Sequence, residues 1–183
     1  MTAPQLLRAA LADPEFLVVA PAHDALSALI AARAGFKATL LGDGLMTNTL
    51  LGRPGNGSFT LTESEFIVSR VTDVCPIPVM VNLHGDRGNT LNVIRAVRTL
   101  ERAGAASVNV ADQSGAGRAG DAVGGAGVAP VAEVVGKLKA ALDARRDRDF
   151  MIVARCDAAA TEGLDRVIER GNRYAEAGAD AFF

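Results

Sequence analysis

The segment that decides the fold is residues 89–110, which read NTLNVIRAVRTLERAGAASVNV. Its apolar residues recur at helical spacing and predict one buried helix face, made of Leu91, Ile94, Val97 and Leu100. Gly104 follows at the position where a left-handed residue commonly ends a helix, and an apolar strand at 107–110 comes next. Helix, short turn and buried strand together predict one repeat of a parallel α/β sheet.

The same unit recurs from one end of the chain to the other. Glycines in similar Ala-Gly turns, at Gly35 and Gly178, also stand shortly before apolar runs. Six such runs predict strands at residues 16–20, 38–42, 79–82, 107–110, 151–155 and 179–183. Two further helix faces are predicted from Val131, Val134, Val135, Leu138 and Leu142, and from Leu164, Val167 and Ile168. The pattern predicts an α/β fold, a (β/α) TIM-type barrel with about six of the eight βα units.

The length of 183 residues predicts a single domain over 1–183, because domains commonly run roughly 100 to 200 residues. A full barrel takes roughly 250 residues and eight strands. The last predicted strand ends the sequence at Phe183, so we expect a barrel that is truncated at its C-terminus or completed from elsewhere. An open sheet is the alternative, and its two exposed edges would favour association, as in a homo-oligomer.

Composition and charge narrow the class of partner. The formal charge is −2 and no block of like charges occurs, so the sequence predicts neither a nucleic-acid groove nor a polybasic membrane anchor. No apolar run approaches a membrane span and the N-terminus lacks a secretory signal, so we expect a cytoplasmic protein with a small-molecule partner. Cys75 and Cys156 lie in apolar runs and are predicted to be buried thiols.

Long loops follow several predicted strands, at residues 43–61, 83–89 and 112–129. The active site of a (β/α) barrel lies at this end of the strands. Five ionisable residues fall near it, namely Asp43, His84, Asp86, Asp112 and Asp157. They predict either a rebuilt acid, base or metal site, in which His84 and Asp86 are the best pair, or a set of solvated and structural loop residues.

Two other patterns carry weaker functional signals. Asp24 is predicted to be a helix N-cap or a first-turn charge stabilised by the helix dipole, and the adjacent His23 is given a structural role. Residues 115–120 match the dinucleotide fingerprint G-x-G-x-x-G, but glycines continue to Gly127 and no helix opens at once. We interpret this stretch as a mobile lid that closes with Arg118 over a ligand.

Framework segments match a known family in order and spacing, at residues 17–28, 50–54, 77–79, 89–103, 112–113, 141–150, 154–155, 157–158 and 162–180. On these residues the chain resembles the isocitrate lyase and phosphoenolpyruvate mutase superfamily. The resemblance spans nearly the whole chain and is strongest to the methylisocitrate lyase, dimethylmalate lyase and carboxyphosphonoenolpyruvate mutase branches. It implies a TIM-type barrel that acts on a small carboxylic acid through an enolate.

The family's metal-supporting motifs are altered in this chain. Where the family carries Asp-x-Asp-x-Gly-x-Gly-Asn, residues 82–89 place Asn82 and His84 at the two carboxylate positions. The family's Glu-Asp-Gln becomes Ala111-Asp112-Gln113. The resemblance implies Mg²⁺ or Mn²⁺, for which Asn82 and Asp112 are the remaining ligands. The loss of three carboxylates argues against that metal, because Mg²⁺ prefers anionic oxygen in octahedral geometry.

The family's substrate-binding positions are partly retained. Its Ser-Gly-Gly, which binds the substrate carboxylate, corresponds to Gly42, Asp43 and Gly44, and the charge of Asp43 would repel that carboxylate. Asn89, which ends the metal motif, is kept and is assigned to substrate binding by the resemblance. Arg155 is also kept, and the resemblance implies that it pairs with the substrate carboxylate, a role that suits the arginine fork.

The family's lid motif, Lys-Arg-Cys-Gly-His, aligns with residues 117–121, which keep Arg118 but lack the catalytic thiol. In the loop after the second predicted strand, the aspartate that the family commonly carries is Gly55 here. We expect a divergent carbon–carbon lyase or mutase for a small 2-oxo or 2-hydroxy carboxylic acid, with His84, Arg118 and Arg155 catalytic. The alternatives are a barrel without catalysis that serves as a binding or assembly subunit, and a truncated product with little stability of its own.

Overall fold

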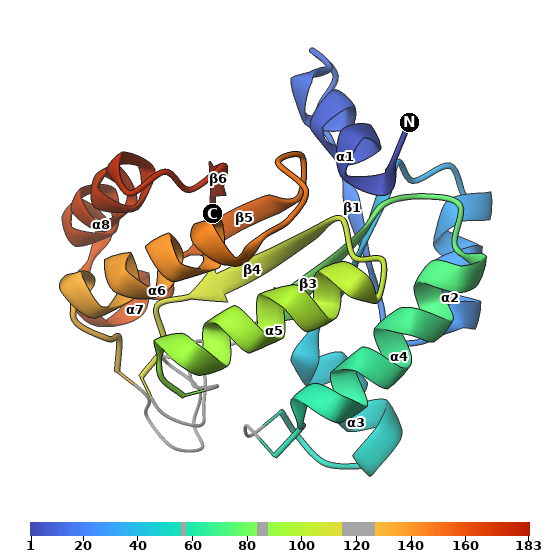
Figure 1. The fold of residues 1–183 in the computed structure, drawn as a ribbon, viewed down its shortest axis with the longest axis horizontal. Helices are drawn as coiled ribbons and strands as arrows, with labels where there is room; N and C mark the ends of the chain where they lie inside the picture. Colours follow the sequence, from blue (N-terminus) through green and yellow to red (C-terminus); the bar gives the residue numbers. More distant parts are fainter. Residues whose placement is uncertain (56–57, 84–87, 115–126) are drawn as a thin grey trace.

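Six parallel strands form one sheet in chain order, β1-β2-β3-β4-β5-β6, in the computed structural model, which describes residues 1–55, 58–83, 88–114 and 127–183 (Figure 1). The strands are β1 (Val19–Ala22), β2 (Ala38–Leu41), β3 (Val79–Leu83), β4 (Ser107–Ala111), β5 (Met151–Arg155) and β6 (Ala181–Phe182). Within these residues the order never reverses, unlike that of a doubly wound sheet, and it is the order of a TIM-type barrel. The predicted fold class is confirmed.

Helices cover one face of the sheet and one end of it. They are α1 (Ala3–Ala12), α2 (Ala25–Arg33), α3 (Asp43–Leu51), α4 (Leu61–Val74), α5 (Thr90–Arg102), α6 (Val131–Ala144), α7 (Ala159–Glu162) and α8 (Leu164–Glu176). Each of α2, α4, α5, α6 and α8 packs against the next, whereas α1 lies apart from this row (Figure 1). None of the helices in the described ranges is long and apolar enough to cross a membrane.

Alternate strand residues enter two separate cores. Val81, Val108 and Ile152 belong to the larger core, between the sheet and its outer helices. Met151 and Val153 lie on the opposite face, in a smaller core that contains Leu7 of α1. Successive side chains of a strand point to opposite faces, so Asn82, Asn109 and Arg155 share the inner face with Val153. Both faces of these strands are therefore covered, as in parallel sheets generally.

The glycine turns between helices and strands are confirmed. Gly35, Gly104 and Gly178 have φ angles of 91°, 90° and 99°. At Gly104 space is also limiting, because a Cβ would lie 2.9 Å from Thr72 Oγ1. Asp24 caps α2 as predicted, since its side chain accepts a hydrogen bond from the Ser27 amide. These short-range features follow from steric and capping preferences that the sequence displays directly.

Several predicted boundaries and faces are wrong. The first strand begins at Val19 rather than at residue 16, and Phe16 is 91% exposed. Leu91 is also exposed, because α5 turns Val93, Val97 and Leu100 toward the core. The loop predicted at residues 43–61 contains the helix α3, whose first turn is closed by the Met46 amide donating to the Gly42 carbonyl.

Helix α8 buries a face that its apolar residues do not predict. Leu164 and Ile168 are exposed, whereas Arg170, Gly171 and Tyr174 are buried. The side chains of Arg170 and Tyr174 are buried here because both have polar partners, Glu162 of α7 for Arg170 and Asp112 after β4 for Tyr174. Both cysteines are half-buried rather than fully buried.

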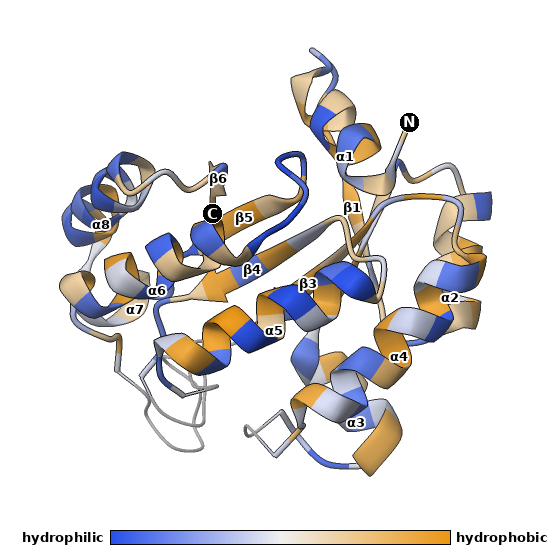
Figure 2. Ribbon diagram, viewed as in Figure 1, coloured by the Kyte–Doolittle hydropathy of each residue, from blue (hydrophilic) through white to orange (hydrophobic). Residues whose placement is uncertain are grey.

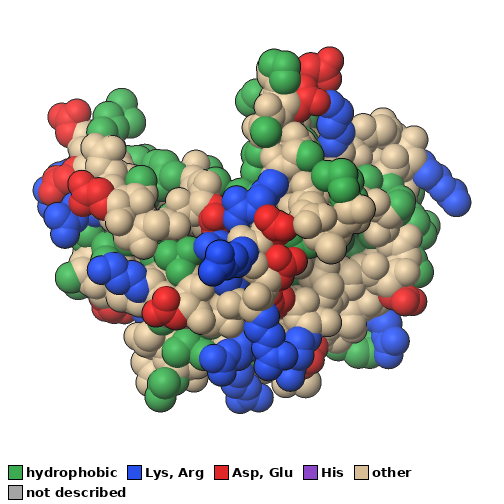
Figure 3. All heavy atoms as spheres, turned by 45° about the horizontal axis from the view of Figure 1, so that its top comes forward, with side chains coloured by type: hydrophobic (Ala, Val, Ile, Leu, Met, Phe, Trp, Pro, Cys, Tyr) green, Lys and Arg blue, Asp and Glu red, His purple; other side chains and the backbone are tan. Residues whose placement is uncertain are grey.

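Polar residues gather on the connections and the outer helix faces. Figure 2 shows hydrophobic residues along β1 and β5 and a hydrophilic connection between α6 and β5. On the face shown in Figure 3, acidic side chains lie among the basic ones. This mixture agrees with the near-neutral charge of the sequence.

Candidate functional site

The carboxyl ends of β3, β4 and β5 bring three polar side chains to the inner face of the sheet. Asn82 of β3 is paired in register with Asn109 of β4, which is paired with Val153 of β5. Arg155 lies two residues beyond Val153, at the level of Ala111. The three residues therefore lie on the same face of the sheet, near the carboxyl ends of their strands.

The two asparagines form a buried pair. Asn109 Nδ2 donates to Asn82 Oδ1 at 2.8 Å. Asn109 is 1% exposed and its Oδ1 has no hydrogen-bond partner, whereas Asn82 is 7% exposed. Asn82 Nδ2 is directed toward the end of β2, because a Cβ built on Gly42 would lie 3.9 Å from it. Asn82 thus pairs with Asn109 on one side and lies next to Gly42 on the other.

The segment after β2 turns directly into α3, with Gly42 as its N-cap and Asp43 and Gly44 in the first turn. The first amides of a helix have no partner inside it, so they form a donor group suited to an anion. The side chain of Asp43 is buried, at 4% exposed. Asn82 Nδ2 and the α3 N-terminus therefore lie side by side as hydrogen-bond donors.

Gly55 approaches the same turn closely. A Cβ on Gly55 would lie 2.7 Å from the Gly44 Cα, a distance that no real Cβ adopts without movement of the backbone. The family's aspartate at this position is thus incompatible with the present path of residues 44 and 55. Glycine at position 55 thus allows the close approach of this residue to Gly44.

Arg155 is held by Asp157. Its Nη2 and Nε atoms donate to Asp157 Oδ1 at 2.8 and 3.1 Å, and its side chain is 8% exposed. The guanidinium carbon lies 5.9 Å from the centre of the Phe183 ring. Asp157 Oδ2 accepts from Gln113 Nε2 at 2.7 Å, which leaves Arg155 fixed in orientation at the mouth.

Asp112 lies below this pair and is fully enclosed by protein donors. Its Oδ1 accepts from the Asp157 amide at 2.8 Å, and its Oδ2 accepts from the Tyr174 hydroxyl at 3.1 Å. Arg170 Nη1 lies 3.5 Å from the same Oδ2, while its Nε and Nη2 bind Glu162 at 2.8 Å each. Asp112 thereby connects the ends of β4 and β5 to α8.

Burial and hydrogen bonds shift the pKa values of several groups around Asp112. The hydrogen bonds to Glu162 raise the pKa of Arg170, and the same contact lowers the pKa of Glu162. Burial raises the pKa of the Tyr174 hydroxyl, so that Tyr174 remains a neutral donor to Asp112. Burial also raises the pKa of the Cys156 thiol to about 12.

The described residues do not fit a divalent metal. Asn82 offers a neutral amide oxygen that already accepts from Asn109, and both oxygens of Asp112 accept from protein donors. Within the described ranges no group of three or more His, Cys, Asp or Glu residues is placed to hold an ion. Mg²⁺ takes oxygen ligands in octahedral geometry and usually at least one carboxylate. No chemical step is therefore derived through a metal here.

The structure describes some of the predicted site residues and not others. Asn82, Asp112 and Arg155 lie at the mouth together with the turn at residues 42–44. His84, Asp86 and Arg118 lie outside the described residues. Asn89 is the N-cap of α5, and its Oδ1 accepts from the amides of Leu91 and Asn92.

Three residues at the site were missed by the sequence analysis, namely Asn109, Arg170 and Tyr174. Asn109 could have been found from its place in an apolar strand, two residues after Ser107 and on the same face. Arg170 and Tyr174 are four residues apart on α8, so they share a helix face, but nothing local signals that this face is buried.

Sequence comparison decides the family, because residues 7–183 match the family model described as Phosphoenolpyruvate phosphomutase. The chain belongs to this family. This chain is 41% identical to the 2-methylisocitrate lyase of Salmonella typhimurium, over 98% of its own length and 61% of that protein. It is 40% identical to the 2,3-dimethylmalate lyase of Eubacterium barkeri, over 91% of this chain and 58% of that protein.

Solved structures agree with this assignment. A phosphoenolpyruvate phosphomutase from Streptomyces platensis subsp. rosaceus superposes with a TM-score of 0.91 and 35% identity, over 98% of this chain and 63% of that one. A phosphonopyruvate hydrolase in complex with oxalate and Mg²⁺ superposes with a TM-score of 0.88 and 30% identity, over 100% of this chain and 62% of that one. The phosphomutase-family chain thus spans about three fifths of the length of the relatives it matches.

Proposed function

We propose that this protein binds a small 2-oxo or 2-hydroxy carboxylic acid at the barrel mouth and cleaves a carbon–carbon bond in it through an enolate. The observation that carries the proposal is the placement of Arg155, a retained and orientated guanidinium, on the same inner face as the Asn82 amide. Its relatives include lyases for 2-methylisocitrate and 2,3-dimethylmalate, which are small carboxylic acids. Family membership and this donor-rich mouth support the same class of ligand.

In the proposed complex, Arg155 pairs with the ligand carboxylate, and the α3 amides at Gly42, Asp43 and Gly44 bind a second oxygen. Arginine matches a carboxylate through two parallel hydrogen bonds. Asp157 holds the guanidinium ready for that contact, at 2.8 Å from its Nη2. Asn89 is assigned to the same ligand by the family resemblance, as a proposal beyond its capping contacts.

The proposed reaction requires a base, an acid and stabilisation of one negative charge. A base removes the proton of a hydroxyl group, and the carbon–carbon bond breaks as that oxygen becomes a carbonyl. The electron pair of the broken bond is left on the other fragment as an enolate, which an acid then protonates. We assign the acid or base role to His84 and assign Arg118 to the closing side of the site. Hydrogen-bond donors that are already fixed in place stabilise the negative charge that develops on the enolate. Asn82 and Arg155 therefore lower the activation barrier for cleavage of the carbon–carbon bond.

The test is turnover of a panel of 2-oxo and 2-hydroxy di- and tricarboxylic acids, followed through the 2-oxo acid released. Arg155→Met is expected to lower kcat/KM by about 100-fold or more, because it removes a buried charged partner of the ligand. Arg155→Lys should recover part of that loss, since a single ammonium cannot replace the fork. Arg98→Met, on the exposed face of α5, is the matched control. Equal kcat/KM for Arg155→Met and Arg98→Met would contradict the proposal.

A second function is favoured by a different observation. Arg155 is already neutralised by Asp157, and Asp112 is enclosed by Asp157, Tyr174 and Arg170. A barrel whose charged groups serve its own structure could bind a ligand or assemble into a homo-oligomer without catalysing a reaction. Ligand binding with no turnover of any acid in the panel would support this non-catalytic subunit over the lyase.

A further inference from the structure

One buried carboxylate, that of Asp112, joins helix α8 to the end of β4. Its Oδ2 accepts from the Tyr174 hydroxyl at 3.1 Å, and Arg170 Nη1 lies 3.5 Å from the same oxygen. Arg170 Nη1 also donates to the Tyr174 hydroxyl at 3.2 Å. Asp112 and Tyr174 are fully buried, and Arg170 is 4% exposed. The carboxylate and the two α8 side chains therefore hold one another in a closed set of contacts.

Asp112 also holds the backbone on both sides of Cys156. Its amide donates to the Arg155 carbonyl at 3.0 Å, and its Oδ1 accepts from the Asp157 amide at 2.8 Å. These contacts fix the backbone from which the side chains of Arg155 and Asp157 extend. The Asp157 carboxylate in turn accepts from Arg155 Nη2 and Nε at 2.8 and 3.1 Å. The orientation of the guanidinium therefore depends on the position of the Asp112 carboxylate.

We propose that two residues of α8, Tyr174 and Arg170, are positioning residues for Arg155. They orient its guanidinium through Asp112 and Asp157 and make no contact with the ligand themselves. The inference rests on the proposed function for one point, that Arg155 is the group that pairs with the ligand carboxylate. It deepens that function by extending the site from the barrel mouth to an outer helix.

Attachment of α8 to the sheet does not by itself require a polar cluster. A buried ion pair adds little net stability, because removing charges from water costs about as much as their attraction contributes, and apolar side chains of similar volume often replace it without loss. Hydrogen bonds add direction, because they fix the angle of a carboxylate as well as its place. Direction matters at Asp112, since one of its oxygens faces Tyr174 and the other faces the Asp157 amide.

Arg170 has two further partners that make it a rigid support. Its Nε and Nη2 donate to Glu162 of α7 at 2.8 Å each, and its Nη1 donates to the Ala129 carbonyl at 2.9 Å. The Ala129 amide in turn donates to the Asp112 carbonyl at 2.7 Å. The guanidinium thus supports both the side chain and the backbone of Asp112. A lysine keeps the charge but has no planar fork with which to make these contacts together.

The first experiment observes the Arg155 guanidinium directly, in the ligand-free protein. Its Nε–H signal in a nitrogen–proton NMR spectrum is assigned from its disappearance in Arg155→Lys. Tyr174→Phe removes only a hydroxyl, and exchange of the Arg155 Nε–H with water should become about tenfold faster, because the support of Asp112 is weakened. Arg170→Lys should change this exchange in the same direction. Unchanged exchange in a folded Tyr174→Phe protein would overturn the inference.

Thr39→Val is the matched control for a general loss of stability. Thr39 is fully buried and its Oγ1 donates to the Ala20 carbonyl at 2.9 Å, so this variant also deletes one buried hydroxyl hydrogen bond. Thr39 lies near the start of β2, at the other end of the strands from Arg155. Thr39→Val should lower the free energy of unfolding about as much as Tyr174→Phe and leave the Arg155 Nε–H exchange unchanged. Equal acceleration in both variants would contradict a positioning role.

Calorimetric titration with oxalate, in buffer with Mg²⁺, connects the inference to the proposed function. Oxalate is a planar dicarboxylate that resembles the enolate of pyruvate. Tyr174→Phe should weaken oxalate binding by about three- to tenfold, and Thr39→Val should leave the Kd unchanged within about twofold. Equal oxalate affinity of Tyr174→Phe and the unmutated protein would overturn the inference and leave the proposed function intact. If the unmutated protein does not bind oxalate, the proposed function fails, and the Nε–H exchange still decides whether α8 orients Arg155.

Discussion

At the scale of single residues, the end of β5 shows how environment decides reactivity. Arg155 and Cys156 are neighbours in the chain, yet one is held at the mouth by Asp157 and the other is half-buried beside Asp112. Burial raises the pKa of the Cys156 thiol to about 12, because a thiolate there would lose its hydration. The raised pKa makes the Cys156 thiol a weak nucleophile at neutral pH.

We predict that Cys156 reacts slowly with iodoacetamide at pH 8 in the native protein. With a pKa of about 12, only about one thiol in ten thousand is ionised at that pH. The rate should rise by about a hundredfold or more in denaturant, where the thiol regains its ordinary pKa. Mass spectrometry of the Cys156 peptide over time gives both rates. Equal rates in the native and denatured protein would contradict the predicted burial effect.

At the scale of elements, α2 shows a contribution that depends on pH. Hydrogen bonds from Ser27, through its amide and its hydroxyl, lower the pKa of the Asp24 carboxyl. A carboxyl with a lowered folded-state pKa adds stability above its unfolded-state pKa, and this stability is lost as the pH falls through the folded-state value. The N-cap of α2 is therefore fully effective at pH 7 and weakens in acid, below the ordinary pKa of aspartate.

We predict that Asp24→Ala lowers the free energy of unfolding by about 1 kcal/mol at pH 7, the usual cost of losing an N-cap. Asp24→Asn should lose only a few tenths of a kcal/mol, because asparagine caps helices about as well. Urea unfolding at pH 7 and at about pH 3, below the ordinary pKa of aspartate, measures the pH dependence, and the deficit of Asp24→Ala should shrink at the lower pH. A deficit that grows in acid would mean that the sign is wrong.

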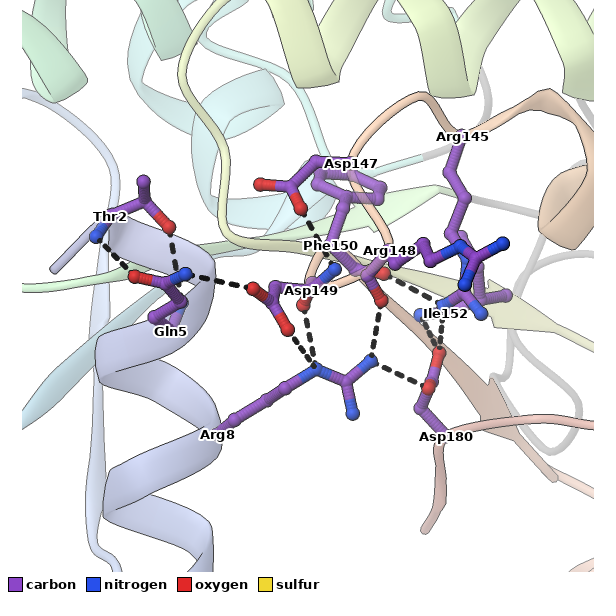
Figure 4. A network of polar contacts seen from close by, with 10 residues as sticks. All are labelled: Thr2, Gln5, Arg8, Arg145, Asp147, Arg148, Asp149, Phe150, Ile152 and Asp180. Carbon is purple, nitrogen blue, oxygen red and sulfur yellow. Dashed lines mark hydrogen bonds and ion pairs between the residues drawn. The ribbon is translucent and has the colours of Figure 1, made fainter.

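At the scale of the whole molecule, Asp180 joins the two ends of the chain. Its Oδ1 accepts from Arg8 of α1 at 2.7 Å, and its Oδ2 accepts from Arg145 at 2.6 Å and from the Ile152 amide at 2.9 Å (Figure 4). Arg8 also donates to the Asp149 carbonyl at 2.8 Å. This network is at the amino end of the strands, where a (β/α) barrel holds its stability rather than its chemistry.

We predict that Asp180→Ala lowers the free energy of unfolding by about 2 kcal/mol, because it removes the carboxylate partner of Arg145, one of the partners of Arg8 and the acceptor of the Ile152 amide. Asp149→Ala, in the same network but 40% exposed, should cost about 1 kcal/mol or less. If residues 1–183 form one domain, both variants will melt in a single cooperative transition. Oxalate affinity should be unchanged in both, and a loss in Asp180→Ala would show that the two ends are coupled.

Much of the fold follows from the sequence because its signals are local. Helical and strand periods, the glycines at Gly35, Gly104 and Gly178 and the cap at Asp24 depend on residues that are neighbours in the chain. Framework segments in order and spacing were enough to identify the superfamily, and the family match over residues 7–183 confirms it. Errors include the start of β1, the helix α3 inside a predicted loop, and the exposed faces of α5 and α8, where packing decides which side is buried.

The sequence by itself determined that the metal motif is altered and that Arg155 is kept. Only the tertiary structure decided which partners these residues have. Asn82 and Asn109 are 27 positions apart, and Asp112 and Tyr174 are 62 apart. Partners at such distances meet only when the strands and α8 are assembled, so no local pattern records that Asp112 is enclosed or that Asn82 pairs with Asn109. Hydrogen bonds between strands and helices, and not residue type alone, set the orientation and charge of this site.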